Sequence, residues 1–298
     1  MRLLAKNTWL VILIAIVVSF VMPSLGMALK PYLNIFLMIL MFLSCLDIDL
    51  KEFWEALKDF KIQALILLIV HLVSPLIILI FFRKFLSDEI FLGLILASVI
   101  PAGRASVFLV SIYGGKPVTA LVISSISNAL SPITVPFLVW LFAKTSIKVN
   151  PVEMGVAILW LVAVPIAAAI LVRWLGWAKY LIKSASGLST IFLFLIIIGI
   201  ISPIRQVIID NWEKSIWLVG LVMGLISFDF WLGWKIGKTK KDKITLAVTS
   251  SYKNYTLGTL VALSLFNPVV ALPSIIYTIT NNLLLIPIQI LSRKNRVK

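Results

Sequence analysis

Two basic residues lie inside apolar stretches of the chain, where a charge is costly. Arg104 stands in VIPAGRASVFL, and Lys253 stands in TSSYKNYTLGT. A charged side chain at the centre of a bilayer costs several kcal/mol or more, and such residues usually mark the path of an ion or a substrate. Both stretches also contain residues that disfavour an uninterrupted helix. Together these features predict a membrane transport protein.

The overall composition is that of a polytopic membrane protein. Of the 298 residues, 61% are hydrophobic, and the mean hydropathy is +1.10, which exceeds what a soluble domain tolerates. The net charge of +15 does not indicate a nucleic-acid partner, because the basic residues form short clusters between apolar spans. One histidine, one cysteine (Cys45) and one clearly intramembrane aspartate do not make a catalytic set. The sequence therefore argues against an enzyme.

Apolar windows of roughly 20 residues, the length that crosses a bilayer, predict ten transmembrane helices. Lysine and arginine are concentrated in the segments that face the cytoplasm if both termini are inside, as the positive-inside rule requires. We therefore expect a multi-pass protein of the cell membrane with cytoplasmic N- and C-termini. The expected spans are 8–26, 29–47, 62–82, 89–113, 117–143, 152–173, 186–203, 215–235, 244–266 and 268–292.

The ten spans divide into two halves of five, residues 1–146 and residues 147–298. The first half ends on PVTALVISSISNALSP and the second on PVVALPSIIYTITNNLLLIP, which share PV-x-AL, an asparagine and a proline. Chance recurrence of these common residues is the alternative explanation. Since each half has an odd number of spans, two copies lie in opposite orientations. That arrangement is the inverted-repeat plan of many secondary transporters.

The penultimate span of each half carries residues that interrupt a helix. Span four holds Pro101 and Gly103, and proline removes a backbone donor and clashes with the preceding turn. Span nine holds serine, threonine and asparagine side chains that compete with the backbone for hydrogen bonds. Unwound backbone is tolerated in a membrane only where it is buried in protein or lines a wet cavity. Two such spans that cross would direct half-helix N-termini at the midplane, where their partial positive charge attracts an anion.

The sequence resembles the bile acid:sodium symporter family, including its prokaryotic members. The resemblance rests on PAGRAS, on GGKPVTALVISSISNALSP, and on YKN-x-x-LG followed by ALSLFNPVVALP-x-x-x-Y-x-x-x-NNL. It covers nearly the whole chain and is most specific over 101–136 and 249–287. It implies a ten-helix fold with a panel domain and a core domain, in which discontinuous helices four and nine cross in the core. It also implies an organic anion carried together with two sodium ions.

The sodium ligands that the resemblance implies are only partly present. Ser106 matches a serine of the span-four crossover, but Val107 replaces the asparagine that follows it in the family. Ser124 matches a span-five threonine, whereas Thr249 stands where the family has a glutamate. Sodium, as a hard cation, requires several oxygen ligands with net negative charge. Ser106, Ser124 and Thr249 are therefore expected to form a vestigial sodium site, and the sequence indicates no other metal and no cofactor.

Lys253 matches a glutamine of the family's span-nine motif, and two functional interpretations remain open. In one, its ammonium replaces a sodium ion as a tethered cation beside Ser106, Ser124 and Thr249. In the other, it loses its proton during the cycle and couples transport to H⁺. Asp229 in span eight is a candidate partner that the side chain of Lys253 could reach. A permanent structural ion pair between them is the alternative, because intramembrane charges do pair.

Other polar residues of the spans are assigned to the substrate or to the coupling ion. Arg104 is expected to face inward and to bind an anionic group, bidentately if that group is a carboxylate. The alternative is a long side chain that reaches the interface from a packed span. Asn281 and Asn282 either contact the substrate or bond across helices, and His71 either packs against its neighbours or carries a proton. The substrate-binding set is predicted to be Arg104, Ser106, Asn254, Asn281 and Asn282. The ion-coupling set is predicted to be Lys253, Asp229, Thr249, Ser124 and His71.

The sequence thus predicts a secondary active transporter that moves a small organic anion across the lipid bilayer by alternating access. Transport would be sodium-independent or proton-coupled, with Lys253 in place of a sodium ion. A sodium-coupled symporter of bile-acid-like anions is the first alternative. A non-transporting receptor or a metabolite exporter with the same fold is the second. Na⁺ or H⁺ is the coupling ion in the interpretations that require one.

Overall fold

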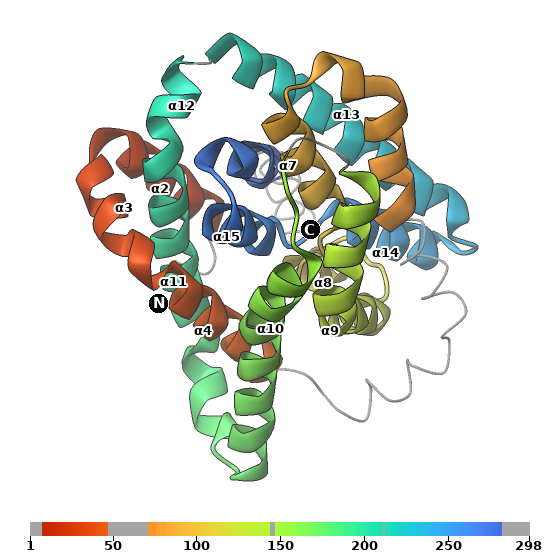
Figure 1. The fold of residues 1–298 in the computed structure, drawn as a ribbon. Helices are drawn as coiled ribbons and strands as arrows, with labels where there is room; N and C mark the ends of the chain where they lie inside the picture. The colour runs from red at the N-terminus through yellow and green to blue at the C-terminus, as the bar shows by residue number, and fades with distance from the viewer. Residues whose placement is uncertain (1–7, 47–70, 144–146, 211, 282–298) are drawn as a thin grey trace.

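The computed structural model describes residues 8–46, 71–143, 147–210 and 212–281, and every regular element in these ranges is helical (Figure 1). The predicted all-helical fold is therefore confirmed for this part of the chain. The α-helices are α2 (Thr8–Val21), α3 (Pro23–Leu29), α4 (Leu33–Leu46), α7 (Asp88–Val99), α8 (Ala105–Ile112), α9 (Pro117–Phe142), α10 (Pro151–Trp174), α11 (Ala178–Ile201), α12 (Arg205–Asp210), α13 (Trp212–Ile236), α14 (Lys240–Ser251), α15 (Tyr255–Leu265) and Pro268–Asn281. Residues 71–77 are also helical and lead into the π-helix η3 (Ile78–Phe82), and the 3-10 turns are η1 (Lys30–Tyr32), η4 (Arg83–Phe85) and η5 (Ser202–Ile204).

Five of the described helices are long and apolar enough to cross a membrane. They correspond to expected spans two, five, six, seven and eight, and their bounds are Pro23–Leu46, Pro117–Phe142, Pro151–Trp174, Gly187–Asp210 and Ser215–Ile236. Shorter apolar helices occupy the places of expected spans one, nine and ten. Much of span three, and span ten beyond residue 281, lie outside the described residues. A multi-pass membrane protein is supported, whereas the number ten and the inverted repeat remain predictions.

Two expected span boundaries are wrong. The first helix ends at Val21, and Pro23 opens α3, which continues through η1 into α4. The expected boundary between residues 26 and 29 therefore lies earlier, because proline cannot continue the hydrogen-bond ladder and favours the first position of a new helix. α11 begins at Ala178, well before the expected residue 186, since the polar segment WAKYLIKS continues the same helix.

The described helices pack as two groups. α4 packs against α10 and α11, and α11 also packs against α2 and α3; these five helices are called the α4 group. α8, α9 and α14 pack on one another, α13 lies along α14, and α15 packs on α7; these six helices are called the crossing group. In Figure 1, α2, α3, α4 and α11 lie at the left and α9, α13 and α14 at the right. The consecutive helices α9 and α10 lie against each other and join the two groups, and α15 also contacts α4, α10 and α11.

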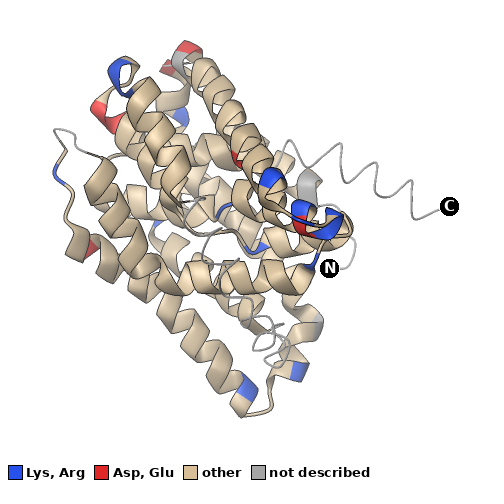
Figure 2. Ribbon diagram, turned by 90° about the vertical axis from the view of Figure 1, so that its right-hand side faces the viewer, with Lys and Arg blue, Asp and Glu red and all other residues tan. Residues whose placement is uncertain are grey.

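The basic hairpin between α13 and α14 is fixed by a helix cap. The Thr239 hydroxyl accepts a hydrogen bond from Asp242 N, and the Asp242 carboxylate accepts from Thr239 N, which is a capping box. Lys116, at the start of α9, places its Nζ 2.7 Å from the same carboxylate. Figure 2 shows most of the acidic ribbon at the upper left, mixed with basic ribbon, whereas the right side and the lower end carry mainly basic ribbon. The two ends of the helix bundle therefore differ in charge.

Asp242 should make the stability of the protein depend on pH. Hydrogen bonds from the Lys116 ammonium and from Thr239 hold the pKa of the Asp242 carboxyl below its usual range. A lowered folded-state pKa stabilises the fold above the ordinary aspartate pKa of about 4, and this contribution is lost as the pH falls through the lowered value. Asp242→Asn should therefore destabilise the protein by up to about 1 kcal/mol near neutral pH, and the two melting curves should converge in acid.

The matched control is Glu153→Gln, which also neutralises a carboxylate in the first turn of a helix, α10. Within the described residues Glu153 belongs to no ion pair closer than 4 Å. Thermal melting of the purified protein across the acid range checks the prediction. A difference between wild type and Asp242→Asn that does not change with pH would contradict it.

Candidate functional site

The interruptions of the two broken helices lie side by side, as the sequence predicted. Residues 100–104 separate α7 from α8, and residues 252–254 separate α14 from α15. Ala102 and Lys253 form an antiparallel bridge at the centre of the two breaks. The flanking hydrogen bonds, each 2.8 Å long, run from Gly103 N to Tyr252 O and from Asn254 N to Pro101 O. The four half-helices are therefore joined through their backbones.

Local sequence explains why the first break is stable. Ile100 is extended, with φ −65° and ψ 153°, because a following proline excludes the helical conformation at the residue before it. Gly103 permits the close approach of the two strands of backbone. A Cβ at that position would lie 2.8 Å from the carbonyl oxygen of Lys253, which is closer than ordinary van der Waals contact allows. The glycine is required here by the opposing chain.

Polar side chains of α9 satisfy the peptide groups of the first break. The amide of Ala102 donates to Ser127 Oγ over 3.0 Å. The carbonyl oxygen of Ala102 accepts from Ser124 Oγ over 3.1 Å and from Asn128 Nδ2 over 3.0 Å. Each unpaired backbone group in a membrane would cost several kcal/mol. These three side chains therefore supply the hydrogen bonds that the peptide groups of Ala102 would have in a continuous helix.

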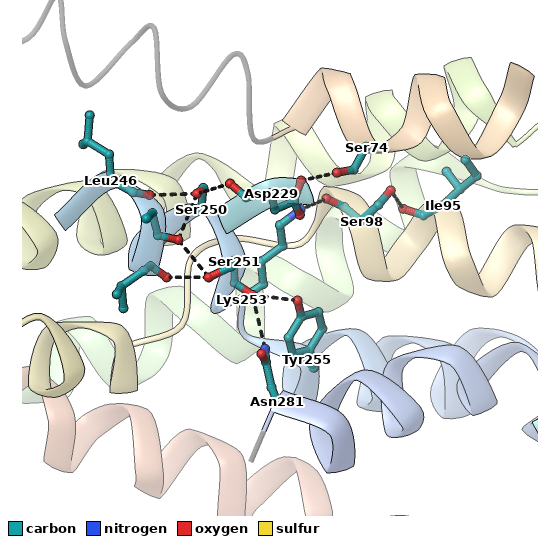
Figure 3. A network of polar contacts seen from close by, with 12 residues as sticks. Ser74, Ile95, Ser98, Asp229, Leu246, Ser250, Ser251, Lys253, Tyr255 and Asn281 are labelled. Carbon is teal, nitrogen blue, oxygen red and sulfur yellow. Dashed lines mark hydrogen bonds and ion pairs between the residues drawn. The ribbon is translucent and has the colours of Figure 1, made fainter. Parts of the chain in front are cut away.

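Lys253 and Asp229 form an ion pair inside the crossing group (Figure 3). Lys253 Nζ lies 3.4 Å from Asp229 Oδ2, and the two side chains are 1% and 3% exposed. The same ammonium donates to the carbonyl oxygen of Ser98, in the last turn of α7, over 2.5 Å. Ser74 Oγ donates to the other carboxylate oxygen of Asp229. The expected pairing of Lys253 with Asp229 is therefore confirmed, and α7, α13 and the second break meet at these two charges.

The three hydroxyls of the expected vestigial sodium site face different partners. Ser124 Oγ is directed at the first break, and Thr249 Oγ1 donates back to Thr245 O within α14 over 2.8 Å. Ser106 Oγ is fully buried and has no hydrogen-bond partner among the described residues. The ammonium of Lys253 is directed at Asp229 and the α7 carbonyl. The role of these hydroxyls as ion ligands thus remains a prediction.

Arg104 contacts a helix of the other packing group. It precedes α8, and its Nη1 donates to Ser44 O while its Nη2 lies 3.2 Å from Cys45 Sγ. Ser44 and Cys45 belong to the last described turn of α4. The side chain of Arg104 is partly buried. Its assignment to the substrate and the alternative, a side chain that reaches the interface, both remain predictions.

A cavity of about 630 Å³ lies beside the crossing. Apolar side chains of α2, α4, α8, α9 and α11 form most of its wall, and polar groups gather where the two breaks meet it. Lys253 borders the cavity, but Figure 3 shows its side chain directed toward Asp229, away from Asn281. The polar residues at the crossing end include Arg104, Tyr252, Asn254, Thr278 and Asn281.

The asparagines of the predicted substrate set have structural contacts as well. Asn254 Oδ1 accepts from Leu257 N and caps α15. Asn281 Nδ2 donates to Ser251 O over 3.2 Å, which is a bond across helices, one of the two roles that the sequence allowed; its contact with a substrate remains a prediction. Asn282 lies outside the described residues. His71 is buried and stands one helical turn before Ser74, the residue that binds Asp229.

Several residues of the site were missed from the sequence. Ser98 and Ser44 contribute backbone carbonyls, which carry no signal of residue type. Ser127 was hidden in the polar run SSISN of α9. Ser74 could have been found from the sequence. It follows His71 by three residues, so the two polar side chains lie on one face of an apolar helix.

Comparisons with known proteins point to one family of transporters. The model of the sodium bile acid symporter family matches residues 34–211. An uncharacterized sodium-dependent transporter of Bacillus subtilis (strain 168), YocS, is 28% identical over 282 residues, which cover 91% of this chain and 86% of that protein. The matches include the first break, the cavity wall formed by α4, α8 and α11, and, in the relative, most of the second half.

The ion pair predicts a non-additive response to mutation. Lys253→Met leaves the Asp229 carboxylate buried without its cation and should destabilise the protein by about 3–5 kcal/mol. The double variant Asp229→Asn/Lys253→Met removes both charges and should recover most of that loss. Unfolding of the purified variants by heat and by denaturant measures the coupling.

Arg83→Met is the matched control, because it breaks the more exposed ion pair of Arg83 with Asp88. That pair should contribute less than about 1 kcal/mol. If Lys253→Met is no more destabilising than Arg83→Met, or if the double variant is as unstable as the sum of its single changes, the buried pair does not have the expected energy.

Proposed function

Because the chain belongs to the sodium bile acid symporter family, we propose that it is a secondary transporter that moves a small organic anion by alternating access. The family and the name of the Bacillus subtilis relative both describe transporters. The observation that carries the proposal is a cavity that ends on a crossing of broken helices with two cationic side chains. Substrate sites of this kind of carrier lie where discontinuous helices meet near the midplane.

The substrate is proposed to bind at the N-terminal ends of α8 and α15. Both ends border the cavity, and the amides at a helix N-terminus carry partial positive charge. Arg104 adds a full charge and a planar fork that matches a carboxylate. Asn254 and Asn281 supply side-chain amides at the same end of the cavity. This combination favours a small carboxylate with an apolar body, since the remaining wall is mostly apolar.

Lys253 is proposed to act as a tethered cation in the place of a coupling sodium ion. Its ammonium sits on a carbonyl of the last turn of α7, where the helix dipole is negative. Half-helix C-termini and unwound carbonyls are the groups that bind Na⁺ in such carriers. A fixed ammonium there makes transport sodium-independent. If the ammonium instead releases its proton during the cycle, Asp229 and Ser98 are the groups that lose its contact, and transport is coupled to H⁺.

Sodium coupling is the alternative, and one observation favours it. Ser106 Oγ and Asn128 Oδ1 are buried oxygens without a hydrogen-bond partner among the described residues. Ser106 is on α8, which follows the first break, and Asn128 is on α9, which binds that break through its side-chain amide. Oxygen atoms of this type bind hard cations. The relative from Bacillus subtilis is named a sodium-dependent transporter. A sodium ion bound by these oxygens would make Lys253 a structural residue.

The proposal also includes the orientation of the chain in the membrane and the inverted repeat of its two halves. With both termini in the cytoplasm, the cavity lies in the inner half of the membrane, because its lining includes Ser111 and Pro117 beside the basic inner loop. The present conformation is then open to the inside. The two five-span halves, 1–146 and 147–298, are proposed to be inverted copies, with the α4 group as panel and the crossing group as core. Motion of one group against the other would expose the site to the opposite side.

Thermal stabilisation by anions should not depend on sodium. We expect one or more of cholate, pantoate and a short keto acid to raise the melting temperature equally in sodium and in potassium, because a ligand stabilises the state that it binds. In Asp229→Asn/Lys253→Gln, which leaves no unpaired charge, the stabilisation should be lost or should come to require sodium. Stabilisation of the wild type that requires sodium would overturn the tethered-cation interpretation and support the alternative.

Arg104 should be necessary for binding the anion. Arg104→Ala should weaken the binding of a stabilising anion by roughly 30-fold or more, since a hydrogen bond to a charged group is worth about 2 kcal/mol. Arg104→Lys should be intermediate, because the charge remains without the bidentate fork. Uptake of the labelled anion into proteoliposomes and titrated thermal shift measure both effects. Wild-type affinity in a folded Arg104→Ala variant would contradict the proposed site, and a protein that moves no anion in either direction would be a receptor.

A further inference from the structure

The contact of Arg104 with α4 joins the two packing groups at the site itself. Arg104 belongs to the crossing group through the first break, and its guanidinium holds the carbonyl of Ser44 and the thiol of Cys45 in the last turn of α4. Arg104 also borders the cavity. The residue proposed to bind the substrate is thus already engaged in this structure by a helix of the other group.

A second arginine provides an internal comparison. Arg173, in the last turn of α10, donates to Leu46 O at the same end of α4 over 3.0 Å. α10 and α4 belong to the same packing group. Both arginines donate to backbone carbonyl oxygens in the last described turn of α4. The hydrogen bond of Arg104 with Ser44 O crosses the boundary between the groups, whereas that of Arg173 with Leu46 O lies within one group. The first bond must break when the groups move apart, and the second need not.

We propose that Arg104 is a latch that holds the empty carrier in the present conformation and is released by the substrate. This inference rests on the proposed function and adds a regulatory role to the same residue. A carboxylate forms stronger, charge-assisted hydrogen bonds with a guanidinium than a neutral carbonyl does. A carboxylate that enters the cavity therefore replaces Ser44 O as the hydrogen-bond acceptor of the Arg104 guanidinium. The end of α4 is then held by Arg173 alone among these two arginines, and the two groups separate.

The latch makes the conformational change of the carrier depend on whether its site is occupied. If the empty carrier changes conformation freely, binding of the substrate does not determine when the conformational change occurs. A contact made only in the empty state lowers the population of the other state, and a ligand that replaces this contact removes the bias. The arrangement therefore links occupancy of the site to motion without a second binding site.

The test measures the distance between the groups in the absence of any ligand. Spin labels are placed at Ile35→Cys on α4 and Phe137→Cys on α9, two exposed positions, in a Cys45→Ser background that retains an acceptor beside Arg104. Pulsed electron paramagnetic resonance then gives the distance distribution. Arg104→Gln should raise the population with separated groups, relative to the population in the present conformation, by roughly tenfold or more. That factor is the equivalent of one hydrogen bond to a charged group. Arg173→Gln, the matched control, should leave the ratio unchanged.

Arg104→Lys serves as a second variant, because it keeps the charge but loses the fork and should give an intermediate ratio. Thermal melting identifies any variant that has failed to fold. A folded Arg104→Gln protein with the distance distribution of its background overturns the latch, as does an equal change in Arg173→Gln. Because no ligand is present, this result is separate from the proposed anion site. Loss of anion binding in Arg104→Gln with an unchanged distribution would refute the latch and leave the proposed function standing.

Discussion

The backbone of the two broken helices must keep its hydrogen bonds inside a membrane, and the rest of the site depends on how it does so. Water cannot satisfy these groups in the hydrocarbon layer, so each unwound peptide needs a partner within the protein. The two hydrogen bonds that flank the bridge between Ala102 and Lys253 provide partners for peptide groups of both breaks at once. Gly103 allows the approach, and the side chains of α9 bind the peptide groups of Ala102 that face away from the bridge.

This pairing fixes where the charges can lie. Lys253 is part of the bridge, so its side chain must leave the second break toward α7 and α13, where Ser98 and Asp229 receive it. Arg104 follows the first break, and its side chain extends instead to the end of α4. The two cations therefore serve different neighbours although their backbones adjoin. One is held within the crossing group, and the other spans the boundary between the two groups.

Lys253 and Arg104 differ in how deeply they are buried, and this difference suits them to different roles. The ion pair of Lys253 and Asp229 is almost completely buried, so its charges cannot be exposed or exchanged without a large cost. Such a pair is suited to replace an ion that never leaves, or to release a proton only when a conformational change alters its surroundings. Arg104 is only partly buried and faces a cavity. Its partners can therefore be exchanged at a smaller cost, which suits a group that binds a transient solute.

The sequence by itself determined the all-helical membrane class, the family, the two interruptions and the residues that carry charge into them. These properties follow from composition, from Pro101 and the polar run of span nine, and from the cost of Arg104 and Lys253 in an apolar segment. It also predicted the partner of Lys253, because Asp229 is the one clearly intramembrane carboxylate in the chain. Only the tertiary structure decided that Ser98 O receives the ammonium and that Ser44 O receives Arg104. Backbone carbonyls are the same in every residue, and which of them meets a side chain 155 or 60 residues away depends on helix packing, which local sequence does not encode.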